Sequence, residues 1–146
     1  MEPITAGGGI IVPVAEYYPI LQEICNRYGI YLIMDEVVCG FGRTGKFWGF
    51  EQYDVDPDMV TMAKGLASSY MPLSATVTRQ EIFDKFLCDP ADPEKGINYF
   101  RDISTYGGCA GATVAALEST RIIEAENLVE NSRVVGDYML ERLQAL

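Results

Sequence analysis

Apolar residues recur along part of the chain with the period of a helix. Between Glu16 and about Tyr28 they follow the i, i+3, i+4, i+7 spacing, in a stripe made of Tyr17, Ile20, Leu21 and Ile24. Gly29 follows at the position where a helix C-cap is expected. Two more helices are predicted near the end of the chain, from about 110 to 124 and from about 127 to 146, the second with an apolar face of Val135, Met139 and Leu143.

Short apolar runs predict two strands, at 30–34 and 59–63, and the alternating, less apolar residues 73–77 predict a third. The first two runs are typical of strands that are buried on both faces of a parallel sheet. Residues 84–99 are polar and are expected to be irregular. Strands interspersed with helices indicate an α/β fold with a mostly parallel sheet flanked by helices. Because three strands leave faces and edges of such a sheet uncovered, we expect residues 1–146 to be a piece of a larger domain.

Composition narrows the class of function. The 146 residues are 49% hydrophobic, which is enough for one core, and the net charge of −10 argues against binding to nucleic acid or to an anionic membrane. No apolar run approaches the roughly 20 residues of a membrane span, and the N-terminus lacks a basic leader, so a soluble cytoplasmic protein is expected. The absence of histidine excludes Ser-His-Asp and Cys-His catalysis within the chain. The cysteines lack a C-x-x-C pair and are expected to be reduced thiols: Cys25, Cys39, Cys88 and Cys109.

Candidate chemistry lies at the ends of the first two predicted strands. One run ends in Asp35-Glu36 and the next in Lys64-Gly65. If the two strands are neighbours, a carboxylate and an amine project into the crevice where parallel sheets bind ligands. A desolvated lysine is a nucleophile towards aldehydes, and a carboxylate opposite a pyridine nitrogen keeps that nitrogen protonated, as pyridoxal phosphate requires. From these residues alone, a solvated ion pair remains the alternative.

Two other motifs resemble ligand-binding loops but lack residues that those loops require. Residues 40–46 match most of a phosphate-binding loop, yet Phe47 stands where the magnesium-binding Ser or Thr belongs. The spaced aspartates at 54, 56 and 58 resemble a calcium loop, yet Pro57 lies inside it and Met59 replaces the required glycine. We therefore predict neither a nucleotide site nor a metal site.

Longer motifs point to a family. Residues 33–45 (Ile-Met-Asp-Glu-Val-Val-Cys-Gly-Phe-Gly-Arg-Thr-Gly) closely resemble the signature of class III aminotransferases, and residues 57–66 resemble the segment that carries the family's cofactor-binding lysine. Residues 104–108 resemble its phosphate-contact segment. The resemblance covers nearly all of the chain in order. It implies the central part of the large domain of a fold-type-I pyridoxal-phosphate-dependent transferase, with the last helix (about 127–146) leading towards a C-terminal small domain.

The resemblance also implies residue roles. Lys64 would form the internal aldimine and move the proton during transamination, and Asp35 would hold the pyridine nitrogen. Val37 would pack on one face of the ring, which is compatible with ordinary core packing. Thr105 would donate a hydrogen bond to the cofactor phosphate across the interface of a homodimer; a hydroxyl that binds its own backbone is the alternative.

The substrates implied are a small-molecule amine and an oxo-acid such as pyruvate. Residues 2–9, 99–109 and 126–132 are most similar to members that use taurine and pyruvate, although Cys109-Ala110 stands where many members have His-Pro or Asn-Pro. Another class III activity on β-alanine or a diamine, or an aminomutase, stays open. So does a non-catalytic remnant or partner-dependent piece, because the family's upstream glycine-rich turn and downstream substrate-binding arginine lie outside these residues. We expect the isolated 146-residue chain to be inactive.

Overall fold

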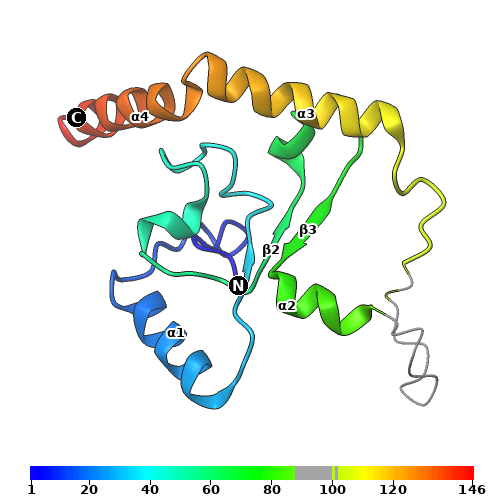
Figure 1. The fold of residues 1–146 in the computed structure, drawn as a ribbon. Helices are drawn as coiled ribbons and strands as arrows, with labels where there is room; N and C mark the ends of the chain where they lie inside the picture. Colours follow the sequence, from blue (N-terminus) through cyan, green and yellow to red (C-terminus); the bar gives the residue numbers. More distant parts are fainter. Residues whose placement is uncertain (88–99, 101) are drawn as a thin grey trace.

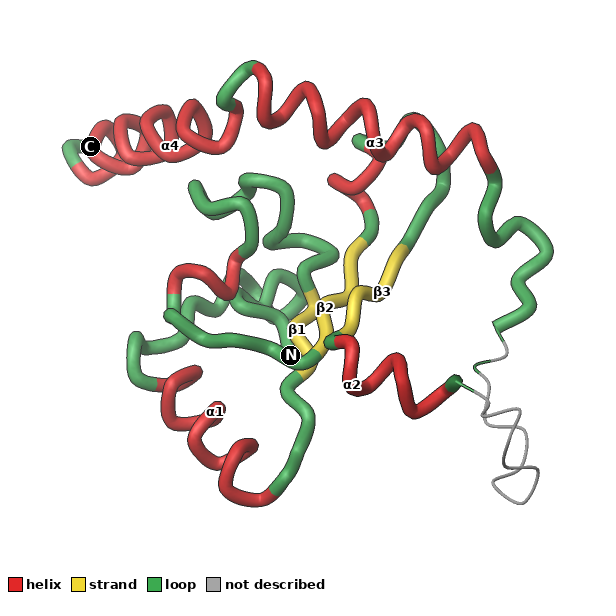
Figure 2. Tube along the Cα trace, in the orientation of Figure 1, coloured by secondary structure: helices red, strands yellow, loops and turns green. Residues whose placement is uncertain are grey.

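The protein folds into a small sheet surrounded by helices, which confirms the α/β class predicted from the sequence (Figures 1 and 2). The computed structural model describes residues 1–87, 100 and 102–146. Its helices and strands, in chain order, are α1 (Tyr17–Tyr28), β1 (Ile33–Asp35), β2 (Met59–Met62), β3 (Ala75–Thr78), α2 (Gln80–Phe83), α3 (Ala110–Ala125) and α4 (Leu128–Gln144). Three short 3-10 turns lie between them: η1 (Gly49–Gln52), η2 (Lys64–Ala67) and η3 (Asp84–Phe86).

The sheet has the strand order β1-β2-β3 and is mixed. β1 and β2 are parallel, with Asp35 opposite Thr61, whereas β3 runs antiparallel to β2. A parallel return usually runs through a crossover helix, and the connection 63–74 contains only the four-residue 3-10 turn η2. The chain therefore turns back beside β2, and of the predicted parallel arrangement the structure retains the β1–β2 pair.

The core lies between α1, β1 and the segment around Tyr53. Buried side chains of Tyr18, Cys25, Leu32, Met34, Tyr53 and Val55 form this core, with Leu21 and Phe50 packed against it. The face of α1 that is buried differs from the predicted apolar stripe by about one residue. Tyr17, Ile20 and Ile24 of the predicted stripe are exposed, whereas Tyr18 and Cys25 are buried. The Tyr18 and Tyr53 rings pack with centroids 4.8 Å apart, and this contact selects the buried face of α1.

Much apolar surface remains uncovered in the described residues. Ile33 is 40% exposed, so β1 is not buried on both faces as the sequence predicted, and Val77 of β3 is 57% exposed. The predicted apolar face of α4 exists but is exposed, with Val135, Met139 and Leu143 each more than half accessible. α3 and α4 form an arm that passes along one end of the sheet and beyond it (Figure 1).

The polar stretch that was expected to be irregular, residues 84–99, begins with the 3-10 turn η3 (84–86), which follows the short helix α2 (80–83). The rest of that polar stretch, with Cys88 and Lys95, lies outside the described residues. Cys25 and Cys39 are buried free thiols, and Cys109 is an exposed one. Burial raises the pKa of the Cys39 thiol, which favours the reduced, protonated form. None of the described helices is long and apolar enough to cross a bilayer.

Candidate functional site

Asp35 and Lys64 lie at the carboxyl ends of two adjacent parallel strands. Asp35 is the last residue of β1, and the next backbone N–H, that of Glu36, donates to the carbonyl oxygen of Thr61 in β2 at 2.8 Å. Lys64 follows Thr61 by three residues and begins η2. The two candidate residues therefore occupy the same edge of the sheet, which is the edge where ligands bind in α/β folds.

The carboxylate of Asp35 is held in place by its own backbone. Its Oδ1 accepts a hydrogen bond from the N–H of Val37 at 3.0 Å, in a turn of the kind that aspartate side chains favour. Asp35 and Val37 are both half-buried. The carboxylate has a defined direction, and among the described residues no donor occupies its Oδ2, so one oxygen can bind a ligand.

Lys64 adopts a left-handed backbone conformation, with φ of 41°. This conformation is uncommon for a residue with a side chain, and such residues often mark functional sites. The side chain is exposed, so the expectation of a desolvated amine was wrong for this chain. The reason is that the described segments pack against the residues of η2 that follow Lys64 and leave the amine itself accessible.

The turn η2 is held from two sides. A Cβ atom on Gly65 would lie 3.1 Å from the Phe41 ring, so glycine allows that ring to pack directly on the backbone beside Lys64. On the other side, the hydroxyls of Ser68 and Ser119 share a hydrogen bond of 2.7 Å, which joins η2 to the buried face of α3. These contacts fix the backbone from which Lys64 projects.

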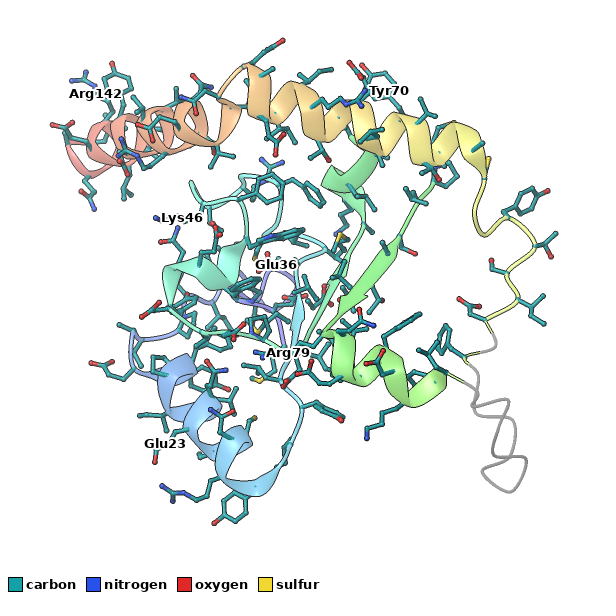
Figure 3. The ribbon with its side chains drawn as sticks, in the orientation of Figure 1. Glu23, Glu36, Lys46, Tyr70, Arg79 and Arg142 are labelled. Atoms are coloured by element: carbon teal, nitrogen blue, oxygen red, sulfur yellow. The ribbon has the colours of Figure 1, made fainter. Side chains whose placement is uncertain are left out.

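Glu36 is a buried carboxylate that was not singled out from the sequence. It is fully inaccessible and lies in the interior of the fold (Figure 3). Its Oε2 accepts the N–H of Gly49 at 2.9 Å and its Oε1 accepts the N–H of Phe50 at 2.8 Å. Burial raises the pKa of this carboxyl, and the two amide hydrogen bonds oppose the rise. No local sequence signal pairs residues 36 and 49, because the contact forms only through the fold.

The loop between Glu36 and η1 does not have the form of a phosphate-binding loop. Phe41, Phe47 and Trp48 pack edge to face, with ring centroids 5.0–5.6 Å apart. Gly42 and Gly45 have left-handed φ values of 89° and 80°, and they lie against α4. The loop is thus a packed structural element.

The aspartates that resemble a calcium loop have protein partners instead. Asp58 accepts the N–H of Leu32 at 2.8 Å, and its other oxygen lies 3.4 Å from Arg79. Asp56 pairs with the same arginine at 2.6 Å. No cluster of three or more metal-ligating side chains exists among the described residues. These carboxylates fasten the start of β2 to the end of β3.

Thr105 is not brought to the strand ends. It lies in the exposed turn 105–108 that precedes α3, on a segment apart from the ends of β1 and β2 (Figure 1). A cavity of about 600 Å³ lies between residues 4–15 and the loop that carries Arg43 and Thr44, and it includes none of Asp35, Val37, Lys64 and Thr105. The structure therefore gathers Asp35, Val37 and Lys64 at one edge and leaves Thr105 elsewhere.

A scan against protein families gives a match over residues 1–146 to the family described as aminotransferase class-III. The chain belongs to the class-III aminotransferases. It is 56% identical, over its whole length, to the taurine–pyruvate aminotransferase of Bilophila wadsworthia, and 51% identical to the hypotaurine/taurine–pyruvate aminotransferase of Paracoccus denitrificans. It spans 31% of the length of each of these relatives.

Solved structures of aminotransferases have the same fold over this segment. A Bacillus anthracis aminotransferase superposes with a TM-score of 0.92 at 47% identity, covering 99% of this chain and 31% of that one. An (S)-enantioselective omega-transaminase from Thermomicrobium roseum superposes with a TM-score of 0.86 at 39% identity, again with 99% and 31% coverage. The family predicted from the motifs around Asp35 and Lys64 is thereby confirmed, as is the α/β arrangement of this class-III segment.

Proposed function

We propose that the protein that carries this chain is a pyridoxal-phosphate-dependent aminotransferase in which Asp35 and Lys64 bind the cofactor. The observation that carries the proposal is the placement of these residues at the carboxyl ends of adjacent parallel strands. Membership of the class-III aminotransferases supports it. Residues 1–146 would form the central part of the large, cofactor-binding domain.

The donor set fits two ends of the cofactor. The oriented carboxylate of Asp35 suits a protonated pyridine nitrogen, and the accessible primary amine of Lys64 suits an aldehyde. When bound, pyridoxal phosphate supplies an electron sink for the carbon that bears the substrate amine. Asp35 would keep the ring nitrogen protonated, Val37 would pack on the ring, and Lys64 would carry the proton to and from the substrate carbon.

We propose that the Thr105 hydroxyl donates a hydrogen bond to the phosphate of the cofactor bound by the other copy in a homodimer. Its turn is exposed and lies apart from the strand ends of its own chain. An exposed hydroxyl on a separate segment fits a contact made to another subunit better than a contact within the same site. The shared site would make the dimer necessary for tight cofactor binding.

Taurine is the amine donor that we propose, with pyruvate as the oxo-acid. The support is the identity of 56% and 51% to relatives whose names include both compounds. The putrescine–pyruvate aminotransferase of Pseudomonas aeruginosa is 38% identical over the same residues. Pyruvate is thus common to the names of relatives that differ in the amine, and the amine is the substrate that needs a direct test.

The test is the formation of alanine from pyruvate by the protein that carries this chain. We expect taurine to be the preferred donor over putrescine and β-alanine, and we expect Lys64→Ala to reduce alanine formation to background. Lys46→Ala is the matched control, because Lys46 is an exposed lysine in the loop before η1 and should be dispensable. If another amine gives a higher rate than taurine, that amine is the donor in place of taurine. If no amine gives alanine, the result favours a non-catalytic protein.

A further inference from the structure

The most constrained side chain next to the candidate site is that of Glu36. Both of its carboxylate oxygens are occupied by backbone amides, those of Gly49 and Phe50, which lie 13 and 14 residues further along the chain. Its own carbonyl oxygen accepts the N–H of Gly40 at 3.0 Å. Its backbone N–H donates to the carbonyl oxygen of Thr61. Every polar group of Glu36 therefore forms a hydrogen bond in the interior of the fold.

Glu36 lies between the two partners of the turn that orients the Asp35 carboxylate. The bond from the Val37 N–H to Asp35 Oδ1 spans residue 36, so its geometry depends on the backbone conformation of Glu36. A side chain clamped at both oxygens restricts rotation about that backbone. Loss of the clamp would therefore release the Val37 N–H and, with it, the direction of the Asp35 carboxylate.

We propose that Glu36 is a positioning residue for Asp35: by clamping the amides of Gly49 and Phe50, it fixes the turn in which Val37 aligns the Asp35 carboxylate. This proposal rests on the proposed function, in which Asp35 faces the ring nitrogen of pyridoxal phosphate. Glu36 does not itself touch the cofactor, because its carboxylate is fully buried among backbone amides.

A second glutamate in the same loop provides a natural comparison. Glu51 accepts the N–H of Trp48 at 3.1 Å, but it is exposed and lies in η1, outside the turn closed by the Val37 N–H. Both glutamates bind backbone amides of the same loop. Glu36 alone of these two lies inside the turn closed by the Val37 N–H, so only its loss should disturb Asp35.

The experiment compares Glu36→Gln with Glu51→Gln in the protein that carries this chain. Glutamine keeps the size of the side chain but turns one acceptor into a donor, which at position 36 faces a backbone N–H with no room for water. If Glu36→Gln does not fold, Glu36→Asp takes its place, since it keeps the charge and shortens the reach to the two amides. Unfolding midpoints of all variants are measured first.

Two readouts report on the turn. Amide hydrogen exchange of Val37, measured without added cofactor, should accelerate roughly tenfold or more in Glu36→Gln, as expected when a buried hydrogen bond loses its support, and should be unchanged in Glu51→Gln. With pyridoxal phosphate bound, the pH midpoint of the cofactor absorption band should shift in Glu36→Gln in the same direction as in Asp35→Asn. A stability loss alone would not move that midpoint.

The outcomes separate this proposal from the function on which it rests. Unchanged Val37 exchange and an unchanged cofactor midpoint in Glu36→Gln, even with a lower unfolding temperature, would overturn the positioning of Asp35. If the wild type binds no pyridoxal phosphate, the proposed function fails. Val37 exchange then still decides whether Glu36 holds the turn: faster exchange supports that contact and unchanged exchange refutes it.

Discussion

The region around the strand ends and the arm formed by α3 and α4 differ in how their side chains are used. At the strand ends, the buried carboxylate of Glu36 binds two amides, and Gly49 is packed so closely that a Cβ atom would lie 2.6 Å from that of Cys39. Along α4, by contrast, no residue is buried, and large apolar side chains such as Tyr138 and Leu140 are more than half exposed.

This difference shows where the chain specifies its own geometry. Contacts among the described residues fix the backbone at the strand ends, so this part of the candidate site is specified within the segment itself. The arm has an apolar face that these residues do not cover, and apolar surface of this extent marks a contact with other protein. The chain spans 31% of the length of the taurine–pyruvate aminotransferase of Bilophila wadsworthia, and α4 contributes no buried residue within this segment.

The largest effect expected from this comparison concerns two methionines. Met34→Ala removes a side chain that is 0% exposed in the core, and should lower the free energy of unfolding by roughly 2–5 kcal/mol. Met139→Ala makes the same change on α4, where the side chain is 61% exposed, and in residues 1–146 alone it should alter the free energy of unfolding by less than about 0.5 kcal/mol. Chemical denaturation of both variants checks this; equal losses would mean that α4 is as well packed as β1.

Two glycines sharpen the same contrast. Gly49→Ala places a methyl group against Cys39 and Pro3 and should destabilise by about 1–3 kcal/mol. Gly136→Ala lies in the middle of α4 with open space around it and should stabilise by about 0.5–1 kcal/mol, because alanine favours the helix. Opposite signs in thermal unfolding are the expected result. A loss of stability in both variants would show that other groups pack against α4 at Gly136.

Tyr18 gives a pH-dependent test of the core. Its hydroxyl donates to the carbonyl oxygen of Glu2, and burial, followed by the neighbouring Tyr17, raises the pKa of Tyr18 to about 12. Because the folded pKa is the higher one, the stability due to the neutral phenol is complete below pH 10 and is lost as the pH rises towards about 12. Tyr18→Phe should cost about 1 kcal/mol at pH 7 and should flatten the alkaline part of the stability curve. An equally steep curve in the variant would assign the alkaline loss to other groups.

The smallest expected effect concerns the hydrogen bond that joins the strand-end region to the arm. Ser68 and Ser119 connect η2 to α3, and a double-mutant cycle with alanine at each position should give a coupling energy of about 0.5–1 kcal/mol. Since Ser68 ends the turn that begins at Lys64, either single variant should also increase hydrogen exchange within η2. Additive stability changes would mean that α3 does not support the lysine turn.

Local patterns in the sequence predicted most of the elements. The ends of α1, α3 and α4 lie within two residues of their predicted positions, because helical periodicity and the glycine at position 29 are local signals. The placement of Asp35 and Lys64 at strand ends was also predicted, since short apolar runs end visibly in polar residues.

Features that depend on distant parts of the chain could not be predicted in this way. The buried face of α1 is chosen by contact with Tyr53, and the antiparallel direction of β3 goes with a connection that contains no crossover helix. The clamp of Glu36 on Gly49 and Phe50 joins residues with no shared motif spacing. Exposure of Lys64 likewise depends on which segments cover η2.

Reductive labelling of Lys64 tests the central claim most directly. Pyridoxal phosphate is added to the protein that carries this chain, the adduct is reduced with borohydride, and the modified peptides are mapped by mass spectrometry. We expect the label to be concentrated on Lys64, to be lost in Lys64→Ala and to be weakened in Asp35→Asn. Label spread over the exposed Lys46 and Lys85, with no preference for Lys64, would contradict the assignment of the lysine and of the cofactor site.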